Sequence, residues 1–279
     1  MKKFIAMILA LVMVMSLVAC GSKTPTEPAD ETKDYASMSL DELKAELKTV
    51  TDGKLTMSTN AAFPPYEMTT DSGDFAGIDV EVAGAIAKLL GLELQIDDMD
   101  FDAALLAVQG DSPKADIVMA GVTVTEDRQL VMDFSNSYAK GIQVVIVKDG
   151  SDIKSIDDLD GKKIGTQMGT TGYIYCSDTP ENGGYGEENV VAYDNCITAV
   201  QALLNDQVDC VVVDNEPAKA MVAANASLSI LDTEFTNEDY AIGVSKTNPC
   251  MLAAVNAAIA QLQADGTFQA IVDKYITAE

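Results

Sequence analysis

Apolar and polar residues follow each other along this chain in blocks that predict strands and helices in alternation. From Lys54 onward, short apolar runs of strand length are separated by stretches in which apolar residues recur at helical spacing. The predicted strands are 55–59, 92–96 and 115–120. The predicted helices between them are 79–90, with Asp79 as N-cap and Gly91 as its end, and 102–109. This order predicts a mostly parallel sheet that helices cover on both faces.

The same alternation starts again further along the chain. After a β-prone run at 142–147, the predicted strands are 163–166, 190–193, 208–214, 228–231 and 240–245, and the predicted helices are 195–205, 216–225 and two C-terminal helices split near 265–266. Two successive α/β units with helices left over at the end predict two lobes, the chain leaving the first lobe and later returning to it. We expect lobe 1 in 54–137 and 241–279, and lobe 2 in 143–235.

The N-terminal segment has the pattern of an export signal. A basic start, Met1–Lys3, precedes an apolar run at 4–18 and the lipobox-like stretch L-V-A-C-G at 17–21. We expect a signal peptide at 1–19, a diacylglyceryl group on Cys20 and a tether to the outer face of a bacterial membrane; the alternative is an ordinary secretory signal with an incidental Cys20. The stretch 20–53 is predicted as a linker with a short helix that begins after Ser39.

Composition excludes several kinds of chemistry. The chain has 44 Asp+Glu against 18 Lys+Arg, a formal charge of −26, so nucleic acid is not an expected partner. With no histidine, there is no Ser-His-Asp triad and no His-ligated zinc site, and we expect no cofactor and no metal. Beyond Cys20, the cysteines show no C-x-x-C spacing; Cys210 is predicted to be buried, and Cys176–Cys196 is the disulfide to test first.

Arg128 is the only arginine in the sequence, at the end of the stretch A-G-V-T-V-T-E-D-R at 120–128. A planar bidentate fork is what arginine offers and lysine does not, so this position suggests a carboxylate partner. The carboxylate could belong to a ligand, or to an internal ion pair with Asp133. From this stretch alone both interpretations stay open.

The loops that follow the predicted strands carry the chemistry of a small-molecule site, because ligands of open α/β sheets lie beyond the carboxyl ends of the strands. Arg128, Thr123 and the amides near Thr170 and Thr171 could hold a carboxylate, and Asp214 could pair with a cation. These groups together match the backbone of a free amino acid, and Phe63 and Phe101 could enclose its side chain. Core packing of the two rings and an N-cap role for Asp214 are the alternatives.

The chain resembles the extracellular solute-binding proteins, family 3, of ABC importers for polar amino acids. The resemblance rests on these motifs: A-A-F-P-P-Y-E at 61–67, G-I-D-V at 77–80, M-D-F at 99–101, A-G-V-T-V-T-E-D-R at 120–128, D-F-S at 133–135, D-L-D-G-K-K-I-G at 158–165, M-G-T-T at 168–171, V-V-V-D at 211–214 and D-G-T-F at 265–268. It implies a type II periplasmic-binding-protein-like fold, two α/β lobes joined by a two-strand hinge near Tyr138–Ile142 and Thr236–Tyr240. It also implies that the lobes close around an amino acid and that the closed form docks on an ABC-transporter permease.

The resemblance also implies roles for single residues. The ligand α-carboxylate would be bound by Arg128, Thr123, Thr170 and Thr171, the α-ammonium by Asp214 and the Gly121 carbonyl, and the side chain would lie between Phe63 and Phe101. Asn60 stands where several relatives have an aspartate, and Gln167 where one has a lysine. Asn60 favours an uncharged polar ligand, with a basic one as the alternative.

Two other functions fit the same scaffold. An enzyme of the cyclohexadienyl dehydratase type would need a carboxyl acid, for which Glu216 and Glu67 are the candidates. A ligand-sensing module would present its closed form to a receptor. Saturable binding without product distinguishes the carrier from the enzyme.

Overall fold

The structure is a computed structural model that describes residues 33–232 and 236–276. The predicted signal peptide at 1–19, the predicted lipid site at Cys20 and the first part of the linker lie outside the described residues. Within the described ranges, no helix is long and apolar enough to cross a membrane.

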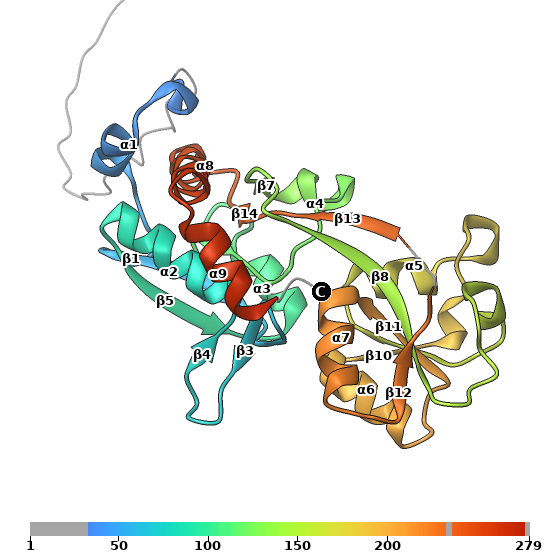
Figure 1. The fold of residues 1–279 in the computed structure, drawn as a ribbon. Helices are drawn as coiled ribbons and strands as arrows, with labels where there is room; N and C mark the ends of the chain where they lie inside the picture. The colour runs from blue at the N-terminus through green and yellow to red at the C-terminus, as the bar shows by residue number, and fades with distance from the viewer. Residues whose placement is uncertain (1–32, 233–235, 277–279) are drawn as a thin grey trace, which may run out of the picture. The chain divides into compact units, whose positions relative to one another are not determined.

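The first sheet joins strands from both ends of the chain (Figure 1). Its order is β5 (Glu93–Asp98), β1 (Lys54–Thr59), β6 (Ile117–Val118), β14 (Gly243–Val244) and β7 (Asp133–Phe134). β1 runs parallel to β5 and β6, as predicted, whereas β14 runs antiparallel to β6 and β7. The helices between and after these strands are α2 (Ile78–Leu90), α3 (Phe101–Ala107), α4 (Glu126–Val131), α8 (Pro249–Ala264) and α9 (Thr267–Tyr275).

The second sheet is built from the middle of the chain. Its order is β10 (Val190–Tyr193), β9 (Ile164–Gln167), β11 (Cys210–Asp214), β8 (Ala139–Lys148) and β12 (Leu228–Ile230), and β13 (Thr236–Tyr240) also pairs with β8. β9 is parallel to β10 and β11, and β8 is antiparallel to β11. The helices are α5 (Thr171–Ser177), α6 (Cys196–Leu204) and α7 (Asn215–Ala223). All of β11 is buried, which explains why its sequence is continuously apolar before Asp214.

Shorter elements complete the fold. β2 (Ala62–Phe63), β3 (Glu67–Thr69) and β4 (Phe75–Ala76) form a small antiparallel sheet next to the predicted ligand loops. Single 3₁₀ turns are found at Tyr35–Ser37, Ile156–Leu159, Pro180–Asn182 and Glu187–Asn189.

The predicted linker helix is α1 (Leu40–Glu46), and it docks on the domain. Ser39 and Glu42 form a capping box, which satisfies backbone donors at its start. Leu43 is 1% exposed and packs in the same hydrophobic cluster as Met251 and Val255 of α8. The helix is therefore part of the folded domain.

Two predicted helix ends are confirmed and one predicted cap is wrong. Gly91 ends α2 in a left-handed conformation, and α8 and α9 separate at Asp265–Gly266. The N-cap of α2 is Gly77 rather than Asp79. Asp79 lies inside the helix and is fully buried, because its carboxylate accepts hydrogen bonds from Gly121 and Tyr138 elsewhere in the fold.

The single strand predicted at 240–245 is two strands in two sheets. β13 pairs with β8 of the second sheet, and β14 pairs with β6 and β7 of the first (Figure 1). Residues 240–242 are all buried and apolar or aromatic, so the hydrophobic pattern does not mark the point at which the chain changes sheets. The two predicted hinge segments lie at the start of β8 and in β13, and these strands pair with each other.

The disulfide chosen for testing, Cys176–Cys196, does not form. Cys176, Cys196 and Cys210 are free thiols, and like Cys250 they are buried. Cys176 packs in the cluster around Ile164 and Val212, whereas Cys196 belongs to a different cluster with Val200 and Leu203. The prediction that Cys210 is a buried small side chain is confirmed.

Candidate functional site

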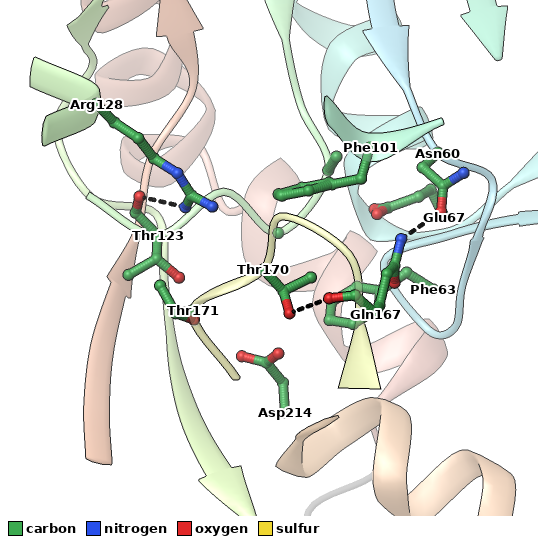
Figure 2. Close-up of a pocket in the computed structure, with 12 residues that line it drawn as sticks. Asn60, Phe63, Glu67, Phe101, Thr123, Arg128, Gln167, Thr170, Thr171 and Asp214 are labelled. Carbon is green, nitrogen blue, oxygen red and sulfur yellow. Dashed lines mark hydrogen bonds between the residues drawn. The ribbon is translucent and has the colours of Figure 1, made fainter. Parts of the chain in front are cut away.

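A cavity lies where the predicted ligand loops meet. Its lining contains all ten residues that the sequence predicted for the site, together with Glu67 and Ala120 (Figure 2). The ten are Asn60, Phe63, Phe101, Gly121, Thr123, Arg128, Gln167, Thr170, Thr171 and Asp214. Asn60, Gln167 and Asp214 lie at or just after the carboxyl ends of β1, β9 and β11, where parallel sheets place their ligand sites.

Arg128 is held in α4 with its guanidinium turned to the cavity (Figure 2). The Thr125 hydroxyl caps the helix by accepting from the Arg128 N–H. Nη1 donates to the Thr123 carbonyl at 2.9 Å, Nη2 to the Gly169 carbonyl at 3.1 Å, and the group lies 5.4 Å from the centre of the Phe101 ring. These contacts fix the orientation of the guanidinium.

No carboxylate in the described part of the chain lies within 4.0 Å of the Arg128 guanidinium, which is 8% exposed. Asp133, the internal partner that the sequence left open, pairs with Lys246 at 3.0 Å instead. Burial lowers the pKa of Arg128, and the carboxylates of Glu238 and Asp214 act in the opposite direction. The side chain stays a cation because an arginine pKa lies far above neutral pH.

Thr123 is oriented by a glutamate that the sequence analysis missed. Its hydroxyl donates to Glu238 Oε2 at 2.7 Å, and the Gln143 amide donates to the same oxygen at 3.3 Å. Since a hydroxyl has one proton, Thr123 Oγ1 has no second proton to give to a ligand carboxylate in this arrangement. Glu238 is 5% exposed and lies on β13, one of the two predicted hinge segments.

Asp214 ends β11 and is 6% exposed. It precedes α7 at the N-cap position but makes no side-chain cap hydrogen bond, so the capping alternative is not realised. Instead its carboxylate accepts a hydrogen bond from the Tyr240 hydroxyl. Burial, followed by the neighbouring Glu238 charge, raises the pKa of Asp214 to about 7.

Several hydrogen bonds at and near the cavity link residues of the first part of the chain to residues of the part that carries the second sheet and its helices. Gln167 Nε2 donates to Asn60 Oδ1 at 3.0 Å (Figure 2), and the Cys196 thiol donates to the Ala62 carbonyl at 3.2 Å. Together with the bond from Arg128 to Gly169, these contacts join the two parts of the chain at the site. Thr170 serves the loop itself: its hydroxyl donates to the Gln167 carbonyl and caps α5.

The two predicted aromatic walls are both present. Phe63 is 7% exposed, stacks with Tyr66 and lies so close to Gly121 that a Cβ there would stand 2.8 Å from the Phe63 ring. Phe101 is 7% exposed at the start of α3. Both rings line the cavity and also pack in hydrophobic clusters. The two interpretations, core packing and enclosure of a ligand side chain, are therefore compatible.

Gly169 offers a test of how closely the two sides of the cavity must approach. It has φ +74°, and an added Cβ would overlap the Asp102 carboxylate of α3. We expect Gly169→Ala to weaken ligand binding about tenfold, roughly 1.4 kcal/mol, in isothermal titration calorimetry. Gly161→Ala is the matched control, because Gly161 has φ +67° with nothing within 4 Å of its Cβ position and tests backbone strain alone. Equal affinities of the two variants would contradict this prediction.

The sequence model of the bacterial extracellular solute-binding proteins, family 3, matches residues 55–278. The chain belongs to this family. The L-cystine-binding protein TcyJ of Escherichia coli (strain K12) is 33% identical over 231 residues, which cover 81% of this chain and 84% of TcyJ.

Solved structures agree with the family assignment. A mutant of ArgBP from T. maritima has a TM-score of 0.75 at 34% identity and covers 86% of this chain and 100% of its own. An ancestral arginine-binding protein bound to glutamine has a TM-score of 0.75 at 38% identity, with 82% and 100% of the two chains covered. The family-3 protein described here is thus a two-lobed α/β solute-binding protein, and its named relatives are binding proteins.

Glu67 and Glu238 are the two acidic groups at the site that the sequence did not assign to ligand binding. Glu67 was considered only as the acid of an enzyme, and Glu238 was not considered. A weak signal exists for Glu238: it alternates with Tyr240 along β13, so both side chains lie on the same face of that strand, and both are buried.

Proposed function

We propose that this protein binds a free amino acid outside the cell and delivers it to an ABC importer. The observation that carries the proposal is a buried, oriented guanidinium with which no carboxylate of the described residues pairs, in a cavity that also contains the carboxylate of Asp214. A ligand with both a carboxylate and an ammonium complements these two charges. The cystine-binding and arginine-binding relatives support the same class of ligand.

Most of the cavity residues have a role in this proposal. Arg128 and the start of α5 at Thr170–Thr171 bind the α-carboxylate, where the N-terminal dipole of the helix adds to the attraction. Asp214 and the Gly121 carbonyl bind the α-ammonium. Phe63 and Phe101 enclose the side chain, and Asn60 and Gln167 contact its far end.

Closure of the cleft supplies the low-dielectric surroundings that strengthen both charge pairs. The paired strands β8 and β13 are proposed as the hinge, with lobe 1 in 54–137 and 241–279 and lobe 2 in 143–235. The ligand binds first to the lobe with Arg128, and the second lobe then adds Thr170, Thr171 and Asp214. The closed form is the one that docks on the permease.

Localisation follows from the N-terminal sequence. Removal of residues 1–19 and lipidation of Cys20 would anchor the protein to the outer face of the cell membrane by two acyl chains, with the stretch after Cys20 as a stalk. The proposed role is binding without catalysis, and the dehydratase function is an outcome that the experiment below distinguishes.

The function is tested by a thermal-shift screen against the twenty amino acids with cystine, ornithine and citrulline. A ligand present at 100 times its Kd adds about 2.7 kcal/mol to the free energy of unfolding, which a thermal melt resolves. We expect one or a few amino acids to raise Tm without being consumed. Turnover of prephenate or arogenate would favour an enzyme instead, and no shift with any amino acid would overturn the proposal.

A further inference from the structure

Glu238 is a buried carboxylate on β13 that holds a residue of the cavity wall. It is 5% exposed, and its Oε2 accepts the Thr123 hydroxyl at 2.7 Å and the Gln143 amide at 3.3 Å. Thr123 lines the cavity (Figure 2), whereas neither Glu238 nor Gln143 is among the described residues that line it. Glu238 therefore acts on the cavity through Thr123.

Gln143 connects Glu238 to a second residue of the cavity wall. It lies on β8, and the register of β8 with β13 makes it a diagonal neighbour of Glu238. Its Nε2 also donates to the Thr171 hydroxyl at 3.3 Å, and Thr171 lines the cavity at the start of α5. Gln143 is 1% exposed, so these contacts hold Glu238 in place between the two strands proposed as the hinge.

The chemistry of Glu238 fixes the direction of its hydrogen bond with Thr123. A carboxylate only accepts hydrogen bonds, whereas a hydroxyl has one proton and two lone pairs. The Thr123 proton therefore points to Glu238, and the lone pairs of Oγ1 remain for the cavity. Thr123 also forms a backbone bridge with Tyr240 of β13, which fixes the main chain at the same place. Both the position and the polarity of the Thr123 hydroxyl are thus set by β13.

We propose that Glu238 is a positioning residue for ligand binding: it holds the Thr123 hydroxyl where a bound amino acid meets it, with the lone pairs of that hydroxyl facing the ligand. The inference rests on the proposed function, in which the amino acid lies against the neighbouring Gly121 carbonyl and the Arg128 guanidinium. Because β13 is one of the two proposed hinge strands, Glu238 links the placement of Thr123 to the hinge. Glu238 itself does not touch the ligand.

A double-mutant cycle tests whether Glu238 acts through Thr123. Thr123→Val removes the hydroxyl and keeps the shape of the side chain, and Glu238→Leu removes both acceptor oxygens and keeps most of the volume. The probe is the amino acid that raises the Tm of wild type most in the thermal-shift screen, and calorimetry measures its Kd. We expect each single variant to bind about tenfold more weakly than wild type. The double variant is expected to bind no more weakly than Thr123→Val, because Glu238 has no other contact with the ligand.

Two conservative variants separate the geometry of Glu238 from its charge, and they test the proposal should Glu238→Leu fail to fold. Both hydrogen bonds end on one oxygen of Glu238, so the carbonyl oxygen of a glutamine in its place accepts both. Glu238→Gln is therefore expected to bind within about threefold of wild type. Glu238→Asp keeps the charge but is shorter by one CH₂ group, so its carboxylate does not reach Thr123 and binding is expected to be about tenfold weaker.

Asp239→Asn is the matched control. Asp239 is the next residue of β13, and its exposed side chain pairs with Lys140 at 2.8 Å. This variant is expected to bind with the affinity of wild type, because successive side chains of a strand point to opposite faces. A circular-dichroism melt of each variant establishes that it is folded at the temperature of the titration.

The outcomes distinguish this inference from the proposed function. If wild type binds no amino acid of the screen, both are overturned. If wild type binds and Glu238→Leu binds equally well, or if the two losses add to about 100-fold in the double variant, the role of Glu238 is overturned while amino-acid binding stands. A Glu238→Asp variant that binds at least as tightly as Glu238→Gln would also overturn the positioning role.

Discussion

Arg128→Ala is expected to abolish measurable binding of the amino acid while the protein stays folded. The guanidinium is 8% exposed and no described carboxylate neutralises it, so its charge is available to the ligand carboxylate. Removing it would leave that carboxylate buried and unpaired. The expected cost is about 2–5 kcal/mol, or roughly 30- to several-thousand-fold in Kd.

Calorimetry measures the affinity of Arg128→Ala, and a circular-dichroism melt establishes that the variant is folded. Arg128→Lys is expected to recover only part of the loss, because lysine keeps the charge but not the fork that spans the Thr123 and Gly169 carbonyls. Asp133→Asn is the control for the internal-pair interpretation and is expected to bind normally. An unchanged affinity in Arg128→Ala would refute the proposed site.

Asp214→Asn is expected to produce the second large loss, again about 2–5 kcal/mol in binding free energy at pH 8. The variant removes the charge that would pair with the ligand ammonium and keeps the size of the side chain. Its neighbour Glu238 remains at the site but already accepts donors from Thr123 and Gln143. Asp209→Asn is the matched control, because Asp209 lies just before β11 and bonds the Lys163 backbone instead.

The pH dependence of wild type follows from the raised pKa of Asp214. The empty folded chain binds this proton more tightly than the unfolded chain does, since the pKa rises from 3.8 to about 7. The contribution of the protonated Asp214 carboxyl group to the free energy of unfolding of the empty protein is therefore complete below pH 3.8 and is lost as pH rises through about 7.

Ligand binding reverses this preference, because an ammonium requires the carboxylate form of Asp214. Affinity is expected to fall about tenfold for each pH unit below 7, in titrations run from pH 5 to pH 8. The part of that slope due to Asp214 should disappear in Asp214→Asn. An Asp214→Asn variant that keeps both the wild-type affinity at pH 8 and the wild-type slope would contradict the ammonium role of Asp214.

Much of the architecture could be predicted from hydrophobic periodicity. The parallel strands β1, β5 and β6 and the helix end at Gly91 follow from local patterns. The predictions fail where the position of an element depends on hydrogen-bond partners that are distant in the sequence. The run at 240–245 is apolar or aromatic up to Ser245, so the pattern could not show that hydrogen bonds to Val122 and Ser135 transfer the chain between sheets.

The lining of the cavity could also be predicted, since strand-end loops converge in an open α/β sheet. The detailed state of each side chain could not. Its place at the start of α2 predicts Asp79 as a helix cap. The donors that its carboxylate accepts from, Gly121 and Tyr138, are instead 42 and 59 residues away in the sequence. The same holds for Thr123, whose hydroxyl is engaged by Glu238, 115 residues later.

The sequence by itself determined the fold class, the family and the set of loops that surround the cavity, because these depend on periodicity, turn residues and motif order. Only the tertiary structure decided which charges are buried and which of them are paired. The long-range contacts that decide this bring Arg128 into a site where no described carboxylate pairs with it, and they bury Glu67 without a hydrogen-bond partner among the described residues. Burial makes an unpaired charge costly, so these contacts determine what a ligand must supply.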